Sequence, residues 1–139
     1  MISRLQIERL RAVFGEYPEV ELAYRFGSSV RHPDRAAKDV DIALLLSSGL
    51  SAERRFDIQS EIAAKAGRIL GMTADVRILN AASPAFVYQV IKRGELISGD
   101  PVKSRDFIVK SLTRYFDYLP LHRFFVDRLQ KRLGVDPHG

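Results

Sequence analysis

The sequence contains no cysteine, which excludes disulfide bridges and thiolate chemistry. It also has no apolar run near the ~20 residues that a membrane-spanning helix needs, and its N-terminus lacks the features of a secretory signal. We therefore expect a soluble, cytoplasmic protein. Hydrophobic residues make up 46% of the 139 residues and charged residues 28%. This globular composition predicts a single domain spanning residues 1–139 with a substantial core.

The charge is unbalanced toward the basic side, with a net charge of +5. Such a charge indicates an anionic partner, which can be a nucleotide, a nucleic acid or an acidic protein surface. The chain lacks the interleaved aromatic and basic residues of an RNA-binding module, so direct nucleic-acid binding is not expected. The three histidines are far apart in sequence and lack the spacing of zinc ligands.

Hydrophobic periodicity and capping residues predict alternating helices and strands. The expected strands are 20–26, 39–46 and 74–79, and the alternation of apolar and polar residues predicts that the first of them is half-buried. The expected helices are 4–14 after a Ser3–Gln6 capping box, the stretch between Ser51 and Gly71, the stretch between Ser83 and Gly94, and a C-terminal helical segment of about 101–134. Pro120 should break or restart that last segment. The sequence therefore predicts an α/β (α+β) fold with a small mixed sheet flanked by helices and C-terminal helices.

The stretch GSSVRHPDRAAKDVD, residues 27–41, contains the main chemical signal. Asp39 and Asp41 open an apolar strand and should point to the same face, about 6.5 to 7 Å apart. Two carboxylates this close repel one another unless a cation joins them, and carboxylate oxygens are ligands that Mg²⁺ selects. The pair therefore indicates a divalent metal site, with a solvent-exposed strand end as the alternative.

The Gly27-Ser28 pair follows directly on the first strand. A Gly-Ser turn offers unhindered backbone N–H groups and a hydroxyl, which together can hold a phosphate. A phosphate beside a metal describes a nucleoside triphosphate. Asp75 is the candidate third carboxylate for a two-metal site, unless it too is a solvent-facing strand end.

These residues, with the later segment ADVRIL, resemble the minimal nucleotidyltransferase (MNT) fold of the DNA polymerase beta superfamily. The whole chain is similar to the MntA-type antitoxins of HEPN–MNT (type VII) toxin–antitoxin systems. The resemblance implies an enzyme that transfers AMP from ATP, with Mg²⁺, to a tyrosine hydroxyl of a HEPN ribonuclease toxin and so inactivates it.

The resemblance also implies roles for individual residues. Asp39, Asp41 and Asp75 would hold two Mg²⁺ ions and form the catalytic site, and Asp75 could help deprotonate the acceptor. The nucleotide would be bound by Gly27, Ser28, Ser29 and Arg31. Lys38 stands where a serine is common in the family and could pair with Asp39.

Two other functions are compatible with the sequence. The chain could be an inactive nucleotidyltransferase-fold module that neutralises a toxin by docking alone, because its C-terminal segment has more apolar residues than one helix face can bury. It could also be a nucleotidyltransferase that modifies a small molecule. The partner expected from the resemblance is a HEPN-type toxin, bound through the C-terminal helices in a hetero-oligomer.

Overall fold

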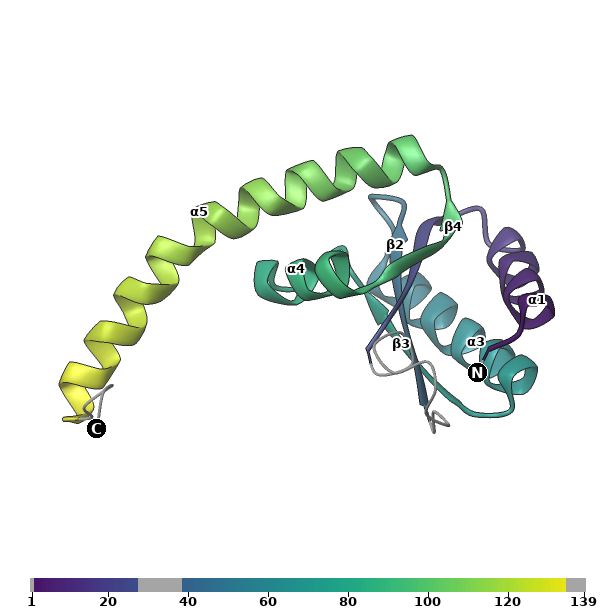
Figure 1. Cartoon of the computed structure of the whole chain (residues 1–139), viewed down its shortest axis with the longest axis horizontal. Coiled ribbons are helices and arrows are strands. Elements are labelled where there is room, and N and C mark those ends of the chain that lie inside the picture. Colours follow the sequence, from purple (N-terminus) through teal and green to yellow (C-terminus); the bar gives the residue numbers. More distant parts are fainter. Residues whose placement is uncertain (1, 28–38, 135–139) are drawn as a thin grey trace.

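The computed structural model describes residues 2–27 and 39–134. In this part of the chain four strands form one mixed sheet in the order β3-β2-β1-β4 (Figure 1). β1 (Val20–Phe26) pairs antiparallel with both β2 (Asp39–Leu46) and β4 (Glu95–Gly99). β3 (Thr73–Ile78) is parallel to β2 and forms one edge of the sheet. The helices are α1 (Arg4–Gly15), α3 (Ala52–Leu70), α4 (Pro84–Arg93) and α5 (Pro101–Leu133).

The sheet is covered by helices on both faces. On one face Val40, Ile42 and Leu44 of β2 pack in a core with residues of α1 and α3. On the other face Leu22 and Tyr24 of β1 pack with residues of α4 and the first turns of α5. The prediction of a half-buried β1 is therefore wrong, because three consecutive residues of the strand, Leu22 to Tyr24, are buried.

The capping residues act as predicted. The Ser3–Gln6 capping box is present at the start of α1. The Ser51 hydroxyl accepts a hydrogen bond from the Arg54 backbone N–H at the start of α3, and Ser83 makes the equivalent bond at the start of α4. α3 ends at Gly71, whose positive φ of 64° suits a residue without a Cβ. These local signals explain why the four helix starts, including that of α5 after Asp100, were predictable.

The C-terminal third differs from the prediction in two features. The strand β4 was not predicted. α5 is one continuous helix that includes Pro120, and it curves along its length (Figure 1). Proline removes one helical hydrogen bond and usually bends a helix. Pro120 lies in an exposed stretch of the helix. Water can therefore donate a hydrogen bond to the backbone carbonyl that Pro120 leaves unpaired in the preceding turn, and the helix continues beyond it.

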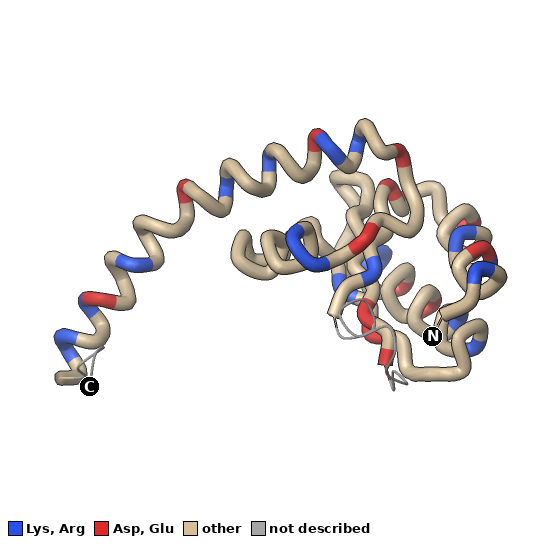
Figure 2. Tube along the Cα trace, in the orientation of Figure 1, with Lys and Arg blue, Asp and Glu red and all other residues tan. Residues whose placement is uncertain are grey.

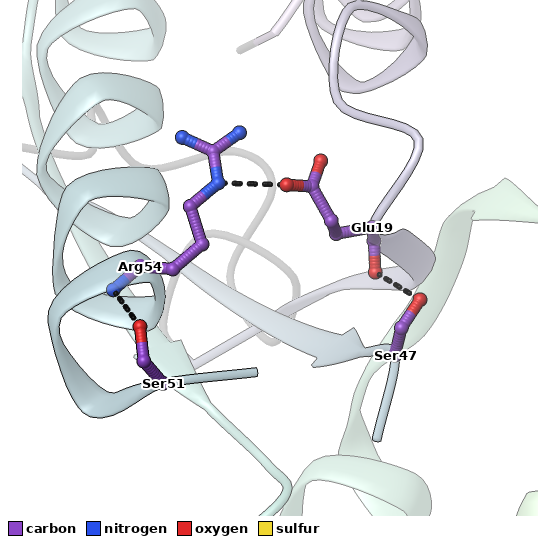
Figure 3. A network of polar contacts seen from close by, with 4 residues as sticks. All are labelled: Glu19, Ser47, Ser51 and Arg54. Atoms are coloured by element: carbon purple, nitrogen blue, oxygen red, sulfur yellow. Dashed lines mark hydrogen bonds and ion pairs between the residues drawn. The ribbon is translucent and has the colours of Figure 1, made fainter. Parts of the chain in front are cut away.

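A polar network ties the start of α3 to the sheet (Figure 3). The Arg54 side chain donates from Nε to Glu19 Oε2 over 2.7 Å, and the Ser47 hydroxyl donates to the Glu19 carbonyl over 3.2 Å. The hydrogen bond from Arg54 holds the pKa of Glu19 below its usual value. The network fixes the end of the sheet opposite to Asp39 and Asp41.

In the described ranges, no helix has the length and apolar character needed to cross a membrane. The second half of α5 extends away from the sheet (Figure 1). Its large apolar side chains are exposed, among them Leu121, Phe124, Phe125, Leu129 and Leu133.

Candidate functional site

The three predicted carboxylates lie on one face of the sheet. Asp41 of β2 is the register partner of Asp75 of β3, and Asp39 stands two residues before Asp41 on the same side of β2. Their neighbours Val40 and Val76 point to the opposite face, into the core beneath α3. The parallel pairing thus brings Asp75 next to Asp39 and Asp41, although the helix α3 separates them in the sequence. Acidic residues lie close together at this end of the sheet in Figure 2.

Gly27 approaches the Asp41 carboxylate from the end of β1. Phe26 is the register partner of Asp41, so the chain leaves β1 directly beside this side chain. Gly27 has φ +84°, and a Cβ added there would lie 2.2 Å from Asp41 Oδ2. Any side chain at this position would be strained and would also displace the carboxylate. Glycine is therefore required both by the backbone conformation and by the approach to Asp41.

The electrostatics of the cluster centre on Asp41. Its partial burial raises the pKa of Asp41, and the nearby charges of Asp75 and Asp39 raise it further, whereas Arg77 opposes them. In the described ranges no three His, Cys, Asp or Glu side chains lie close enough together, as placed, to hold one metal ion. The three aspartates are nevertheless an all-oxygen donor set of concentrated negative charge. That chemistry fits Mg²⁺, because a divalent cation relieves the repulsion that raises the pKa of Asp41.

Sequence reasoning missed the cation beside this cluster. Arg77 follows Asp75 by two residues, so both lie on the same face of β3, and its Nε is 3.6 Å from Asp75 Oδ2. The Arg77 guanidinium also lies over the ring of Phe86 of α4, 5.6 Å from its centroid. Phe86 in turn meets Phe26 edge to face, with 5.6 Å between ring centroids. The alternation of strand residues was the signal that could have found Arg77.

The remaining predicted residues, Ser28, Ser29, Arg31 and also Lys38, lie outside the described residues. The expected phosphate site is therefore described here only through Gly27. A cavity of about 440 Å³ lies at the opposite end of β2, where Leu45 and Leu46 line it. We place the candidate site at the carboxylates rather than at this cavity, because the ionisable cluster and the glycine approach are found there.

Comparison with known proteins agrees with the geometry. The family model described as polymerase beta, nucleotidyltransferase matches residues 8–101. The chain is 30% identical over 121 residues to the protein adenylyltransferase MntA of Shewanella oneidensis, and the match covers 87% of this chain and 84% of that protein.

Two solved structures share the fold. One is a tri-AMPylated Shewanella oneidensis HEPN toxin in complex with MNT antitoxin, with a TM-score of 0.73 and 23% identity over 91% of this chain and 98% of that chain. The other is a toxin–antitoxin with AMP-PNP, with a TM-score of 0.75 and 23% identity over 89% of this chain and 98% of that chain. The four-stranded sheet with its flanking helices and long C-terminal helix is thus a known arrangement.

Proposed function

Because the chain belongs to the polymerase beta nucleotidyltransferase family and is a homologue of MntA, we propose that it is an antitoxin that inactivates a partner HEPN toxin. It does so by transferring AMP from ATP, with Mg²⁺, to a tyrosine hydroxyl of that toxin. The observation that carries the proposal is the register of Asp41 with Asp75, with Asp39 beside them. Gly27 approaches Asp41 so closely that no side chain would fit at its position. The activity of MntA as a protein adenylyltransferase and the complex of an AMPylated toxin with its antitoxin support the choice of reaction and partner.

In this reaction the residues of the chain would bind the phosphates and the metal. Gly27 and the following residues Ser28, Ser29 and Arg31 would bind the phosphates. Asp39, Asp41 and Asp75 would hold Mg²⁺, which when bound neutralises developing charge on the phosphates. These roles follow the order of the strands, since the glycine turn lies at the end of β1, Asp39 and Asp41 on β2, and Asp75 on β3.

In the transfer itself the phenol oxygen forms a bond to the α-phosphorus of ATP. The bond from that phosphorus to the diphosphate breaks, and the phenolic proton passes to a carboxylate. We assign this proton to Asp75, and its position on the edge strand, which a large acceptor could approach, supports the assignment. The overall products are AMP-protein and diphosphate.

The direct test uses ATP labelled in its α-phosphate, Mg²⁺ and the partner toxin. We expect wild type to label the toxin and Asp39→Ala/Asp41→Ala to label it at least ~10³-fold more slowly, since the metal ligands are lost. The matched control is Asp57→Ala/Glu61→Ala, which removes two exposed carboxylates from α3 and should label normally. Equal labelling by both double variants would refute the proposal.

Neutralisation by docking is the second candidate, and the exposed second half of α5 favours it. Phe125 and Leu129 are 60% and 55% exposed, and basic residues recur along this helix (Figure 2). The family model ends at residue 101, so nearly all of α5 lies outside it. We propose that this segment is the part of the chain that contacts the toxin.

The two candidates are separated by one growth assay with the toxin. Catalysis predicts that Asp39→Ala/Asp41→Ala abolishes protection. Docking alone predicts that protection survives this change but is lost in Phe125→Asp/Leu129→Asp, which alters only exposed positions. An enzyme that must also dock loses protection in both.

A further inference from the structure

Another pocket, of about 390 Å³, lies against the edge strand β3 close to the carboxylate cluster. It is lined by residues of three elements and the loop between two of them, among them Gln59 of α3, Arg77 of β3, Ala81 and Ser83 of the loop, and Phe86 of α4. Arg77 joins the pocket to the site, because the same side chain reaches Asp75. None of the roles assigned above uses this pocket.

The order of the strands shows on which side of the carboxylate cluster the pocket lies. Gly27 lies at the end of β1, Asp41 on the inner strand β2 and Asp75 on the edge strand β3. The pocket lies against the edge strand at Arg77 and Ile78, on the side of the cluster away from β1. In an in-line displacement the attacking oxygen and the leaving diphosphate lie on opposite sides of the phosphorus. If the glycine turn holds the phosphates on the β1 side, the acceptor must enter from the β3 side.

We propose that this pocket, here called the acceptor pocket, receives the phenol ring of a tyrosine carried by the partner protein. This inference rests on the proposed function. It adds the surface that positions the acceptor and the residues that form it.

The chemistry of the walls suits a phenol. Phe86 offers an aromatic ring for ring–ring contact and is itself held edge to face by Phe26. Ala81 leaves room for a ring, and Arg77 provides a cationic group at the end of the pocket that adjoins Asp75. A tyrosine side chain has the matching form, with an apolar ring and a polar tip.

The wall on the α3 side is fixed by a hydrogen bond. Gln59 Nε2 donates to the Val76 carbonyl over 2.6 Å, which ties α3 to the edge strand. Because the edge strand is held in this way, the pocket keeps a constant position relative to Asp75 on the same strand. A rigid acceptor site lowers the entropy cost of bringing the hydroxyl to the phosphorus.

The test fills the pocket with Ala81→Trp. Ala81 is exposed and contributes to the pocket rather than to the core. The chain has no tryptophan, so the fluorescence of the new indole reports its surroundings directly. The matched control is Ala64→Trp, at an alanine of α3 that is also exposed and lies outside the pocket.

We expect the Ala81→Trp indole to emit at shorter wavelength than that of Ala64→Trp, which shows that it occupies the pocket. The rise in Tm on adding Mg²⁺ and a non-hydrolysable ATP analogue should be the same in both variants. Transfer of AMP to the toxin should fall ~10²-fold in Ala81→Trp only, as expected when an acceptor is displaced by about 1 Å or more.

Two results would overturn the inference. One is transfer by Ala81→Trp at the rate of Ala64→Trp, and the other is an indole that emits as if in water, because the pocket then does not admit a ring. If the wild-type protein itself transfers no AMP to the toxin, the proposed function is refuted instead. In that case binding of N-acetyltyrosinamide, followed by NMR without nucleotide, still decides: binding to wild type but not to Ala81→Trp supports the pocket, and no binding to wild type refutes it.

Discussion

Replacing Gly27 by alanine separates the backbone role of this glycine from its approach to the carboxylate. A non-glycine residue in the left-handed region costs about 1 to 2 kcal/mol, and Gly27 has φ +84°. For a domain of this size we expect Tm to fall by about 3 to 8 °C. The new Cβ would also lie 2.2 Å from Asp41 Oδ2, well inside van der Waals contact.

The Asp41 carboxylate is the end of a flexible side chain, so it can move aside at little cost to the fold. Moving it takes the central carboxylate of the cluster out of place. A displacement of about 1 Å in a catalytic group can reduce the rate ~10²-fold. Gly27→Ala should therefore be modestly destabilised and, in addition, nearly inactive in AMP transfer.

Gly49→Ala is the control for this prediction. Gly49 has nearly the same backbone conformation, φ +82°, but a Cβ there meets nothing within 4 Å. Thermal denaturation should show similar losses of Tm in the two variants. The labelled-ATP assay with the toxin should show normal transfer by Gly49→Ala only, and equal activity of the two variants would refute the role given to Gly27.

Three further predictions concern ionisation and the core. The pKa of Asp41 is raised above its usual value of 3.8, so the stability associated with its protonated form is full below pH 3.8 and is lost as pH rises through the raised pKa. Asp41→Asn should therefore raise Tm at pH 7, with little difference at pH 3, and should reduce the stabilisation that Mg²⁺ gives to wild type; a lower Tm at pH 7 would contradict this. The pKa of Glu19 is lowered from its usual 4.5, so its stabilising effect is present above pH 4.5 and is lost as pH falls through the lowered pKa. Glu19→Gln should lower Tm at pH 7 and converge with wild type in acid, and a pH-independent difference would show that the ion pair is not the cause. Tyr24→Phe removes the 2.6 Å hydrogen bond to the buried Ser104 hydroxyl, which should cost about 1 to 3 kcal/mol in urea denaturation. Adding Ser104→Ala should recover part of that loss, because it removes the hydroxyl that Tyr24→Phe leaves unpaired. If stability is not recovered, the unpaired Ser104 hydroxyl is not the cause of the loss.

Features written in short stretches of sequence were predictable. The cap residues Ser3, Ser51 and Ser83 each act within one helical turn, so their effect does not depend on distant parts of the chain. The common face of Asp39 and Asp41 followed from the alternation of a strand, and the core on the other side confirms it. The family was evident from the same residues.

Features that depend on tertiary packing were not predictable. Nothing local shows that α4 and α5 cover the second face of the sheet, so β1 was read as half-buried. β4 has only five residues and directly follows the helix end at Gly94, which leaves too short a pattern to recognise. The pairing of Asp41 with Asp75 depends on parallel strands joined across α3, and the contact of Arg77 with Phe86 depends on where α4 packs. The roles of Gly27, Ser28, Ser29 and Arg31 in nucleotide binding remain predictions. So do the metal-binding and catalytic roles of the three aspartates.

The parallel pairing of β2 with β3 also links the site to folding. Asp41 and Asp75 become neighbours only after the 19-residue helix α3 has crossed over the sheet and docked. Such non-local contacts slow folding, because the entropy cost of closing the loop must be met before the pairing stabilises the chain. A partly folded chain therefore lacks the carboxylate cluster, and a ligand that binds the cluster stabilises the folded state alone. On the proposed function, such ligands are nucleotide and metal, and raising their concentrations should make the folded protein more resistant to proteolysis.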